Sequence, residues 1–359
     1  MHNETLNNNR IGGVKLSKPT LRVAHLIPSM DIGGVEVAIY KSYHKLNDVI
    51  DYRVFWIRRS GSLKSNQKAV YRLIIDIILR KWKPDIIITS LWWAHCLGPL
   101  VRLLNIKWVA FFHSTNFTNF LDLIFSRYAW RKSNSCFVDS MATRNFFVSY
   151  LDRKSYIIPY VFEEPMPINS HGGRSNDIVW VGRVVREKRI DILFNLISII
   201  NEYLEENSYF SRKINICVVL AGEPLLNVPD FSSMNKINIE IASNLSNGEV
   251  FGILSNSRLY VMTSDTEGMS MTTIEAIQAG CVPVVRRVGE VANYLSDEAC
   301  IEITDVSIAG LKITALQMVA LLRDREFSDV IKVNAQRSIE SLGYYVDTLK
   351  ISLADVIDG

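Results

Sequence analysis

The sequence contains few cysteines, and none of them form the close pairs found in disulfide scaffolds or zinc sites. They are odd in number and scattered, at Cys96, Cys136, Cys217, Cys281 and Cys300. Such spacing is typical of a reduced protein in which each thiol is a small core residue. With 359 residues, 48% of them hydrophobic and 21% charged, the chain can bury a core without disulfides or a metal.

Long apolar runs are also absent. The first twenty residues are polar and rich in asparagine, unlike the apolar centre of a secretory signal peptide. We expect residues 1–20 to be a flexible N-terminus. No run reaches the roughly 18 apolar residues that a membrane span needs. We therefore expect a cytoplasmic protein, either soluble or peripheral on the inner face of the cytoplasmic membrane.

Charge is distributed unevenly along the chain. Residues 1–168 hold 23 Lys and Arg against 12 Asp and Glu, a balance of +11. The remainder holds 40−23=17 basic and 37−12=25 acidic residues, a balance of −8. This asymmetry indicates that the first half meets something anionic. The alternative is that two domains differ in charge without functional consequence.

Short apolar segments followed by helical patterns recur through the first half of the chain. Apolar strands are predicted over 23–27, 85–90, 108–113, 135–140 and 156–159. Helical patterns occur at 35–46 and over IIDIILRKWK (74–83), where Pro84 ends the helix. This alternation predicts an α/β domain whose parallel sheet is covered on both faces.

Residues 163–177 interrupt the alternation with prolines, glycines and polar residues, as a linker does. The pattern then restarts, with strands over 177–182, 216–223, 259–264 and 282–285 and helices over 190–206, 248–256 and 271–279. We expect domains over 21–165 and 166–338, and a C-terminal helix over 339–359 that packs back toward the first domain. Because ligands bind at the carboxyl ends of parallel strands, both domains should turn those ends toward a shared cleft.

Two carboxylates lie around a predicted helix start in the stretch SDTEGMSMTTIEAIQAG (264–280). Glu267 and Gly268 occupy the loop, the helix starts near Ser270, and Glu275 lies one turn later. Glycine and free N–H groups suit a phosphate, and a carboxylate can accept hydrogen bonds from two sugar hydroxyls. Each carboxylate alone could instead be a helix cap or a solvated loop acid.

A basic loop follows the strand at 177–182. It carries Arg183, Arg186, Lys188 and Arg189 directly before a helix. Cations at the carboxyl end of a strand, beside a helix start, suit a diphosphate. Read alone, such a loop is more often a solvated surface.

Together these stretches resemble the large family of retaining glycosyltransferases that have the GT-B fold and an E-x7-E motif, often called family four. The motif is Glu267 to Glu275, and the family's V-G-R-x-x-x-x-K element is matched at 181–188. Its opening glycine element is matched by IPSMDIGGVE, which contains Gly33, Gly34 and Glu36. The resemblance runs from about residue 22 to the C-terminus. It implies an α/β protein of two facing Rossmann-like domains with a cleft between them.

The resemblance assigns roles to individual positions. Arg183 and Lys188 would bind the donor diphosphate, Glu275 the ribose, and Glu267 the donor sugar. His113 would lie near the transferred sugar, with a structural histidine at the cleft edge as the alternative. The remaining donor-binding positions are Gly33, Gly34, Gly182, Gly268, Met269 and Ser270.

The implied reaction moves a sugar with retention from a nucleotide-diphosphate sugar, UDP- or GDP-linked, to a hydroxyl of a glycan or lipid-linked acceptor. No D-x-D metal site is evident, so we expect neither metal nor cofactor, with Arg183 and Lys188 in place of a divalent ion. Same-face attack is favoured over double displacement, because no nucleophile stands out. The turn IIPYVF lacks the family's Asn-Gly pair and ASNLSN (242–247) lacks a usual glycine, which leaves the base open.

Two further segments, at 70–83 and 120–132, combine apolar, aromatic and basic residues. As helices they would suit an anionic lipid surface, although their apolar faces could equally be core. A lipid-linked acceptor in bacterial surface-polysaccharide or lipopolysaccharide assembly would fit both this pattern and the basic first half.

Other functions remain as alternatives. A non-catalytic sugar-nucleotide-binding subunit or a nucleotide-sugar epimerase could share the fold, although an epimerase should lack the E-x7-E element. A dinucleotide dehydrogenase is disfavoured because no G-x-G-x-x-G opens a helix after the first strand. A nucleic-acid partner is disfavoured because the basic excess has no recognition motif beside it.

Overall fold

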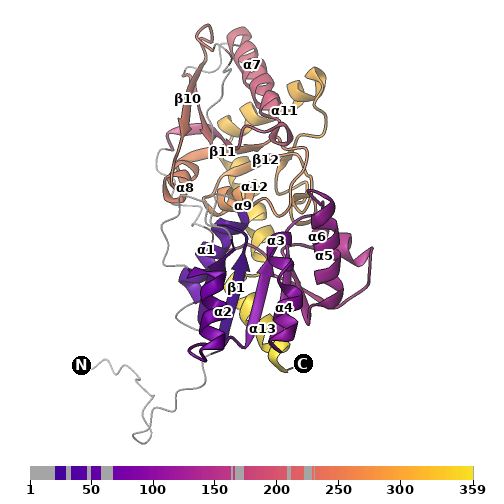
Figure 1. The fold of residues 1–359 in the computed structure, drawn as a ribbon. Coiled ribbons are helices and arrows are strands. Elements are labelled where there is room, and N and C mark those ends of the chain that lie inside the picture. The colour runs from indigo at the N-terminus through magenta and orange to yellow at the C-terminus, as the bar shows by residue number, and fades with distance from the viewer. Residues whose placement is uncertain are drawn as a thin grey trace, which may run out of the picture.

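The computed structural model describes residues 21–29, 34–46, 50–57, 68–162, 165, 174–207, 212–221, 229 and 231–358. The predicted flexible segment 1–20 lies outside the described residues, as does Gly33. Within the described part, the strands form a seven-stranded and a six-stranded sheet, and all the pairings are parallel. Figure 1 shows the two α/β domains that these sheets build, one above the other.

The N-terminal sheet has the strand order β3-β2-β1-β4-β5-β6-β7. Its inner strands are continuous apolar runs with buried side chains, as a sheet covered on both faces requires. The strands are β1 (Arg22–Ile27), β2 (Asp51–Trp56), β3 (Lys68–Ala69), β4 (Ile86–Ser90), β5 (Lys107–Phe112), β6 (Ser135–Val138) and β7 (Ser155–Ile157).

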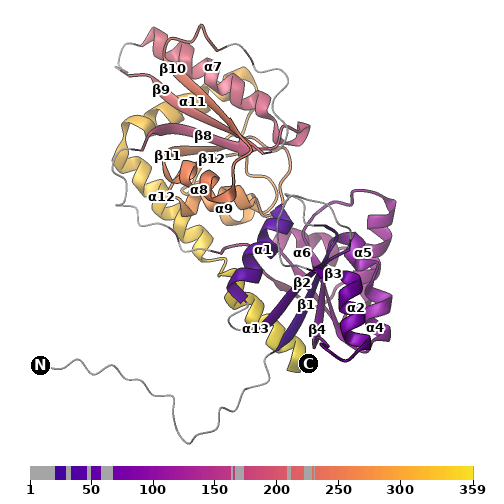
Figure 2. The ribbon, with the colours of Figure 1, turned by 60° about the vertical axis from the view of Figure 1, so that its left-hand side comes forward.

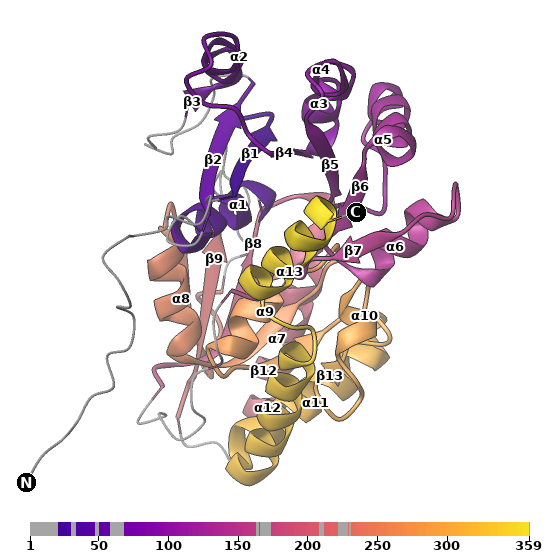
Figure 3. The same ribbon diagram turned by 90° about the horizontal axis from the view of Figure 1, so that it is seen from below.

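Two groups of helices cover the two faces of this sheet (Figure 3). On one face lie α2 (Val70–Ile78), α3 (Leu91–His95), α4 (Gly98–Leu103), α5 (Phe120–Lys132) and α6 (Met141–Val148), in one apolar cluster with the sheet. On the other face lie α1 (Gly34–Leu46) and α13 (Tyr345–Asp358). The prediction of a helix over 74–83 was wrong in its second half. The helix ends at Ile78 because Arg80 adopts a left-handed conformation, with φ 53°.

The C-terminal sheet has the order β10-β9-β8-β11-β12-β13. Its strands are β8 (Asn176–Gly182), β9 (Ile214–Leu220), β10 (Ile237–Ser243), β11 (Ser257–Met262), β12 (Val282–Val285) and β13 (Ile301–Glu302). Helices α7 (Ile190–Glu206) and α11 (Ile308–Arg323) pack on one face, and α8 (Asn247–Ser255), α9 (Met271–Gln278) and α12 (Arg325–Glu340) on the other (Figure 2). The short α10 (Val291–Tyr294) precedes β13.

The chain returns to its first domain at the end. After α12 it crosses to α13, where the Tyr345 N–H donates to the Val161 carbonyl at 2.9 Å. The buried Tyr345 ring stacks on Tyr160 and packs against Phe162. At the other end of α13, the Lys107 ammonium donates to the Val356 and Ile357 carbonyls, each at 2.7 Å. One helix from the end of the sequence therefore completes the N-terminal domain.

Candidate active site

The loop between β11 and α9 meets the N-terminal domain at the carboxyl ends of β5 and β6. A Cβ added to Gly268 would lie 3.5 Å from the His113 carbonyl and 3.9 Å from the Asp139 carboxyl. A residue at this position must be small if the two walls of the cleft are to come this close. The strand ends of the two domains thus face each other, as predicted.

Glu290 bridges the same cleft. Its carboxylate accepts the backbone N–H groups of Met141 at 3.1 Å and Ala142 at 2.8 Å, at the start of α6. These N–H groups have no partner within their own helix. Asn293 holds the Glu290 carboxylate from behind, at 2.8 Å. A carboxylate of the C-terminal domain therefore caps a helix of the N-terminal domain.

The basic loop after β8 places its cations on the C-terminal wall. Arg186 to Lys188 form one turn of 3-10 helix, and Arg189 is left-handed at φ 46°, which redirects the chain into α7. The Lys188 ammonium pairs with Glu267 at 2.6 Å, and the Glu267 carboxylate also accepts from the Ser264 hydroxyl at 2.6 Å. Arg183 is exposed, with no ion pair among the described residues. Lys188 and Glu267 are thus brought together, with Arg183 nearby along the loop.

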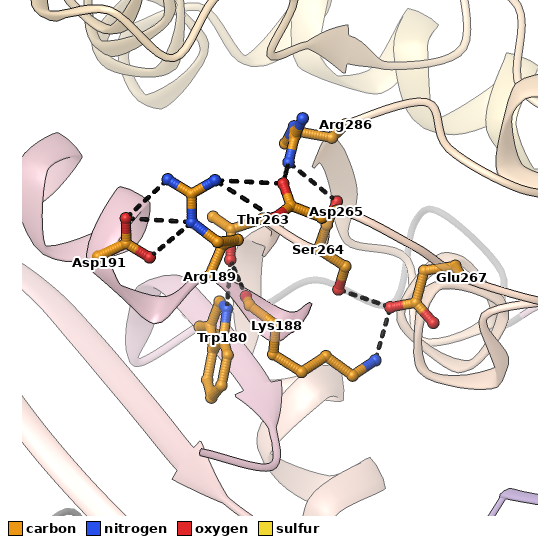
Figure 4. Close-up of polar contacts among 9 residues, drawn as sticks. All are labelled: Trp180, Lys188, Arg189, Asp191, Thr263, Ser264, Asp265, Glu267 and Arg286. Atoms are coloured by element: carbon orange, nitrogen blue, oxygen red, sulfur yellow. Dashed lines mark hydrogen bonds and ion pairs between the residues drawn. The ribbon is translucent and has the colours of Figure 1, made fainter. Parts of the chain in front are cut away.

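A network of ion pairs holds the basic loop after β8 against the loop after β11 (Figure 4). Arg189 pairs with Asp191 at 2.8 Å and with Asp265 at 3.2 Å, and Arg286 also pairs with Asp265. Burial raises the pKa of Asp265, but the hydrogen bonds from Arg286 and Arg189 outweigh it, so the net pKa is lowered. Asp265 therefore stays ionised and holds both arginines in place.

The start of α9 is shaped by two special backbone positions. Ser270, the residue before the helix, is left-handed at φ 53°, and Met269 is buried beneath the loop. Gly289 lies against this loop with φ +60°, and a Cβ there would lie 1.8 Å from the Glu267 carbonyl. Only glycine fits at 289, so this position sets the path of the loop that carries Glu267 and Gly268.

Glu275, one turn into α9, points at the other domain. Its carboxylate pairs with the Lys41 ammonium of α1 at 2.7 Å, and both side chains are about three-quarters covered, with exposed fractions of 22% and 26%. Gly34 begins α1, the same helix. Gly182 ends β8 against Trp180. A Cβ added to Gly182 would lie 2.7 Å from the Trp180 ring, which is too close for a side chain there.

His113 is held at both ring nitrogens. Nδ1 shares a hydrogen bond with the Tyr160 hydroxyl at 2.6 Å, and Nε2 shares one with the Ser90 hydroxyl at 2.9 Å. Ser90 in turn contacts His25 Nε2 at 2.7 Å. Burial lowers the pKa of His113 well below its usual value, and the neighbouring His25 and His95 lower it further. The ring is therefore neutral and fixed in orientation.

Comparison with known proteins places this geometry in context. The overall structure is similar to sucrose-phosphate synthase from Thermosynechococcus elongatus, with a TM-score of 0.66 and 13% identity over 93% of this chain and 98% of that one. It is also similar to HepE of Anabaena in complex with UDP, with a TM-score of 0.67 and 15% identity over 94% and 100%. A glycosyltransferase from Rickettsia africae gives a TM-score of 0.64 and 13% identity over 95% and 99%.

The chain has the GT-B fold. The predicted fold class is confirmed. Residues 161–336 match the sequence profile of the family described as "Glycosyl transferases group 1", which supports the predicted glycosyltransferase class. None of the curated protein sequences matches this chain. No helix in the described part of the GT-B chain is long and apolar enough to cross a membrane.

Several residues at this GT-B cleft escaped the sequence analysis. Lys41 and Glu290 act across the domains, on partners 234 and about 149 residues away, and no local pattern marks such pairs. Asp139 carries a weak signal, since it directly follows a buried strand end. Its side chain is 3% exposed. Burial raises its pKa to about 6, because this effect exceeds the opposing hydrogen bonds from Thr143 and Ser140.

Proposed function

We propose that this protein is a retaining glycosyltransferase that moves a sugar from a nucleotide-diphosphate sugar to a hydroxyl acceptor. One observation carries the proposal. Two carboxylates at E-x7-E spacing, Glu267 and Glu275, flank the start of α9, and each is held by a lysine, Lys188 and Lys41. The loop that carries Glu267 faces the part of the N-terminal domain that holds His113, since Gly268 approaches the His113 backbone.

In this proposal the donor lies along the C-terminal wall. Arg183 and Lys188 bind its diphosphate, and Glu275 accepts hydrogen bonds from the ribose hydroxyls. Glu267 and the backbone N–H groups of Gly268, Met269 and Ser270 hold the sugar. The nucleotide is UDP or GDP, and HepE of Anabaena, whose fold is similar, has been solved with UDP and with UDP-glucose.

The chemistry requires stabilising a departing diphosphate and an electron-poor sugar carbon. Fixed cations at the diphosphate stabilise the negative charge that develops as its bond to the sugar carbon breaks. The acceptor oxygen forms the new bond on the same face, and its proton passes to the departing phosphate oxygen. We propose that Arg183 and Lys188 supply the charge that a divalent metal supplies in other transferases. His113 lies near the sugar as a positioned neutral group.

The test is donor binding and donor hydrolysis with UDP-, GDP- and ADP-sugars, with and without added divalent metal. We expect one donor to bind, and Arg183→Ala to abolish binding because a diphosphate contact is lost. Arg337→Ala is the matched control, since Arg337 is exposed on α12 away from the cleft. A folded protein that binds no donor would refute the proposal and favour a scaffold role.

The acceptor is a glycan or a lipid-linked sugar at the cytoplasmic membrane, in bacterial surface-polysaccharide assembly. An outer surface on α2, α4 and α5 supports membrane contact. It exposes large apolar side chains, at Tyr71, Ile75, Ile78, Leu79, Leu100, Leu103, Phe120, Leu121 and Ile124. Exposed cations lie among them, at Arg72, Arg80, Lys81, Lys83, Arg102, Arg127, Arg131 and Lys132. Apolar groups beside cations are the composition that binds anionic lipid surfaces.

Sedimentation with lipid vesicles tests this surface. We expect binding to vesicles that contain phosphatidylglycerol and weak binding to pure phosphatidylcholine, because the surface is basic. Ile78→Glu should weaken binding about tenfold by placing a charge in the apolar part. Ile351→Glu on α13 is the control, since Ile78 and Ile351 are 70% and 66% exposed on opposite faces of the sheet. Equal binding to both vesicle types would contradict membrane recognition by charge.

A further inference from the structure

The N-terminal domain contains a cavity of about 290 Å³ beside the proposed reaction centre. It lies at the carboxyl ends of β4 and β5, between α3 and the start of α5. Aromatic and aliphatic side chains form most of its wall, at Pro28, Leu91, Trp92, Trp93, Phe111, Phe112, Phe117 and Phe147. His113 belongs to the same wall, so the cavity opens toward the place where the sugar would be transferred.

Several polar groups of the wall already have hydrogen-bond partners within the protein. Asp122 accepts from the Thr118 N–H at 2.8 Å and from the Ser126 hydroxyl at 2.8 Å. His95 Nδ1 shares a hydrogen bond with Thr89 at 2.9 Å, and the Ser114 hydroxyl donates to the Asn116 carbonyl at 2.9 Å. A hydroxyl buried against these engaged groups would lose its bonds to water with few partners to replace them, which is unfavourable.

The entrance of the cavity is aromatic and half-exposed. Trp92 and Trp93 stack with ring centroids 4.5 Å apart, and Trp92 also stacks on Phe125 of α5 at 6.4 Å. The Trp93 side chain is 53% exposed although it lines the cavity. The segment that supplies the lining residues Phe117 and Asp122 also carries Phe120 and Leu121 at the start of α5, which are 71% and 50% exposed. Exposed apolar side chains therefore occur on the same stretch of chain that lines the cavity.

We propose that this cavity binds the hydrocarbon part of the acceptor, so that the acceptor is an amphipathic molecule whose hydroxyl lies at His113. The proposal rests on the transferase function proposed above and specifies its acceptor. An apolar cavity of roughly 150 Å³ already accommodates benzene, so the space here admits a chain of several carbons. Its position on the N-terminal wall leaves the charged C-terminal wall to the donor.

Alkyl glucosides of increasing chain length, used below their micelle concentrations, test the cavity by calorimetry. The affinity of the wild-type protein should rise about fourfold for each added methylene until the cavity is filled, which corresponds to about 0.8 kcal/mol per buried CH₂. Methyl glucoside and maltose should bind weakly, because they lack an apolar chain. Affinity that is independent of chain length, or tighter for maltose than for octyl glucoside, would overturn the proposal.

A charge at the entrance gives the second readout. Trp93→Glu should abolish the dependence on chain length, and Trp93→Ser should reduce it, whereas Ile351→Glu on α13 should leave it intact. Equal chain-length dependence in all four proteins would overturn the assignment of this cavity. UDP-sugar binding is measured in parallel on the wild type. Donor binding without chain-length dependence refutes the cavity assignment alone, whereas chain-length dependence without donor binding refutes the transferase proposal and with it the acceptor role.

Discussion

The two walls of the cleft differ in the chemistry of their polar groups. On the N-terminal wall, His113 lies between the hydroxyls of Ser90 and Tyr160, in surroundings that keep the imidazole neutral. On the C-terminal wall, Lys188 and Arg189 are ion-paired with carboxylates of the facing loop. Around His113 the N-terminal wall therefore offers neutral and apolar contacts, whereas the loops of the C-terminal wall offer a fixed array of charge.

The net charges of the two halves do not match the charges of the two cleft walls. The first half carries +11 and the second −8, yet most of the cations named at the cleft belong to the second, and Lys41 is the exception from the first. Much of the excess of the first half lies on the outer helices α4 and α5 and in the turn after α2, where Arg102, Arg131 and Arg80 are exposed. The comparison shows that net charge describes what an outer surface attracts, whereas a site is defined by the few charges that its loops hold in place.

The largest effect is expected from breaking the charged wall. If the proposed function holds, Lys188→Met should lower kcat/KM about 100- to 1000-fold, because it would remove a cation from the proposed diphosphate site and leave Glu267, 11% exposed, without its ion pair. Lys312→Met, an exposed lysine on α11, is the control. Transfer or donor-hydrolysis kinetics measure the effect. A Lys188→Met protein as active as the control would mean that this wall does not bind the donor.

The next largest effect is expected on stability, from Gly289, which lies against the loop that carries Glu267. Gly289→Ala should lower the free energy of unfolding by about 2 kcal/mol or more, since its positive φ and its contact with the Glu267 carbonyl leave no room for a methyl group. Urea unfolding measures this. Gly252→Ala on α8 is the matched control, because a Cβ there meets nothing within 4 Å, and it should be neutral or stabilising.

The neutral wall should be the acid-sensitive one. Burial lowers the pKa of His25 and of His95 to about 3. Above the unfolded pKa of about 6.5 both rings are neutral in the folded and unfolded states, and the folded state has its full stability. As the pH falls from 6.5 toward 3, only the unfolded state takes up protons at these rings, so the folded state loses stability. Between pH 7 and 5 each histidine should cost the folded state about 2 kcal/mol. Hydrogen exchange should show protection lost first in the N-terminal domain, because no histidine follows His171; uniform loss across both domains would contradict this.

Asp139, also in the N-terminal domain, should change stability with pH in the opposite direction to the histidines. Its pKa of about 6 lies above the unfolded value of 3.8, so its protonation stabilises the folded state as the pH falls through 6. Between pH 7 and 5 this contributes about 1 kcal/mol. Asp139→Asn should therefore be more stable than the wild type at pH 7, and the difference should shrink at pH 5. A constant difference in unfolding free energy would show that the carboxyl does not titrate in this range.

Elements with a strong local pattern could be predicted from the sequence. Continuous apolar runs gave β4 and β5, and the glycine loop before a helical pattern gave the start of α9. β2 was missed because Asp51 and Arg53 interrupt its apolar residues and pair with each other at the sheet margin. α3 was missed because it is a short helix that starts at Leu91, whose left-handed φ of 67° no local pattern indicates.

The candidate site divides in the same way. The spacing of Glu267 and Glu275 is visible along one loop and helix, so both could be named in advance. Lys188, the partner of Glu267, was also named, but Lys41 could not be, since it lies in the other domain and meets Glu275 only in the folded protein. The sequence alone does not indicate that Lys41 and Glu275 lie close together in space. The assigned roles of these residues stay predictions until donor binding is measured.

The return of α13 to the first domain also affects how the protein is made. The strands of the N-terminal sheet are complete by Ile157, but α13, which shares one of its faces with α1, begins at Tyr345. A ribosome that adds about 5 to 20 residues per second needs roughly 9 to 38 seconds for the 345−157=188 residues between them. During that interval the nascent chain carries a sheet with part of one apolar face uncovered. Chaperone binding during synthesis should therefore concentrate on this first domain, although it is translated first.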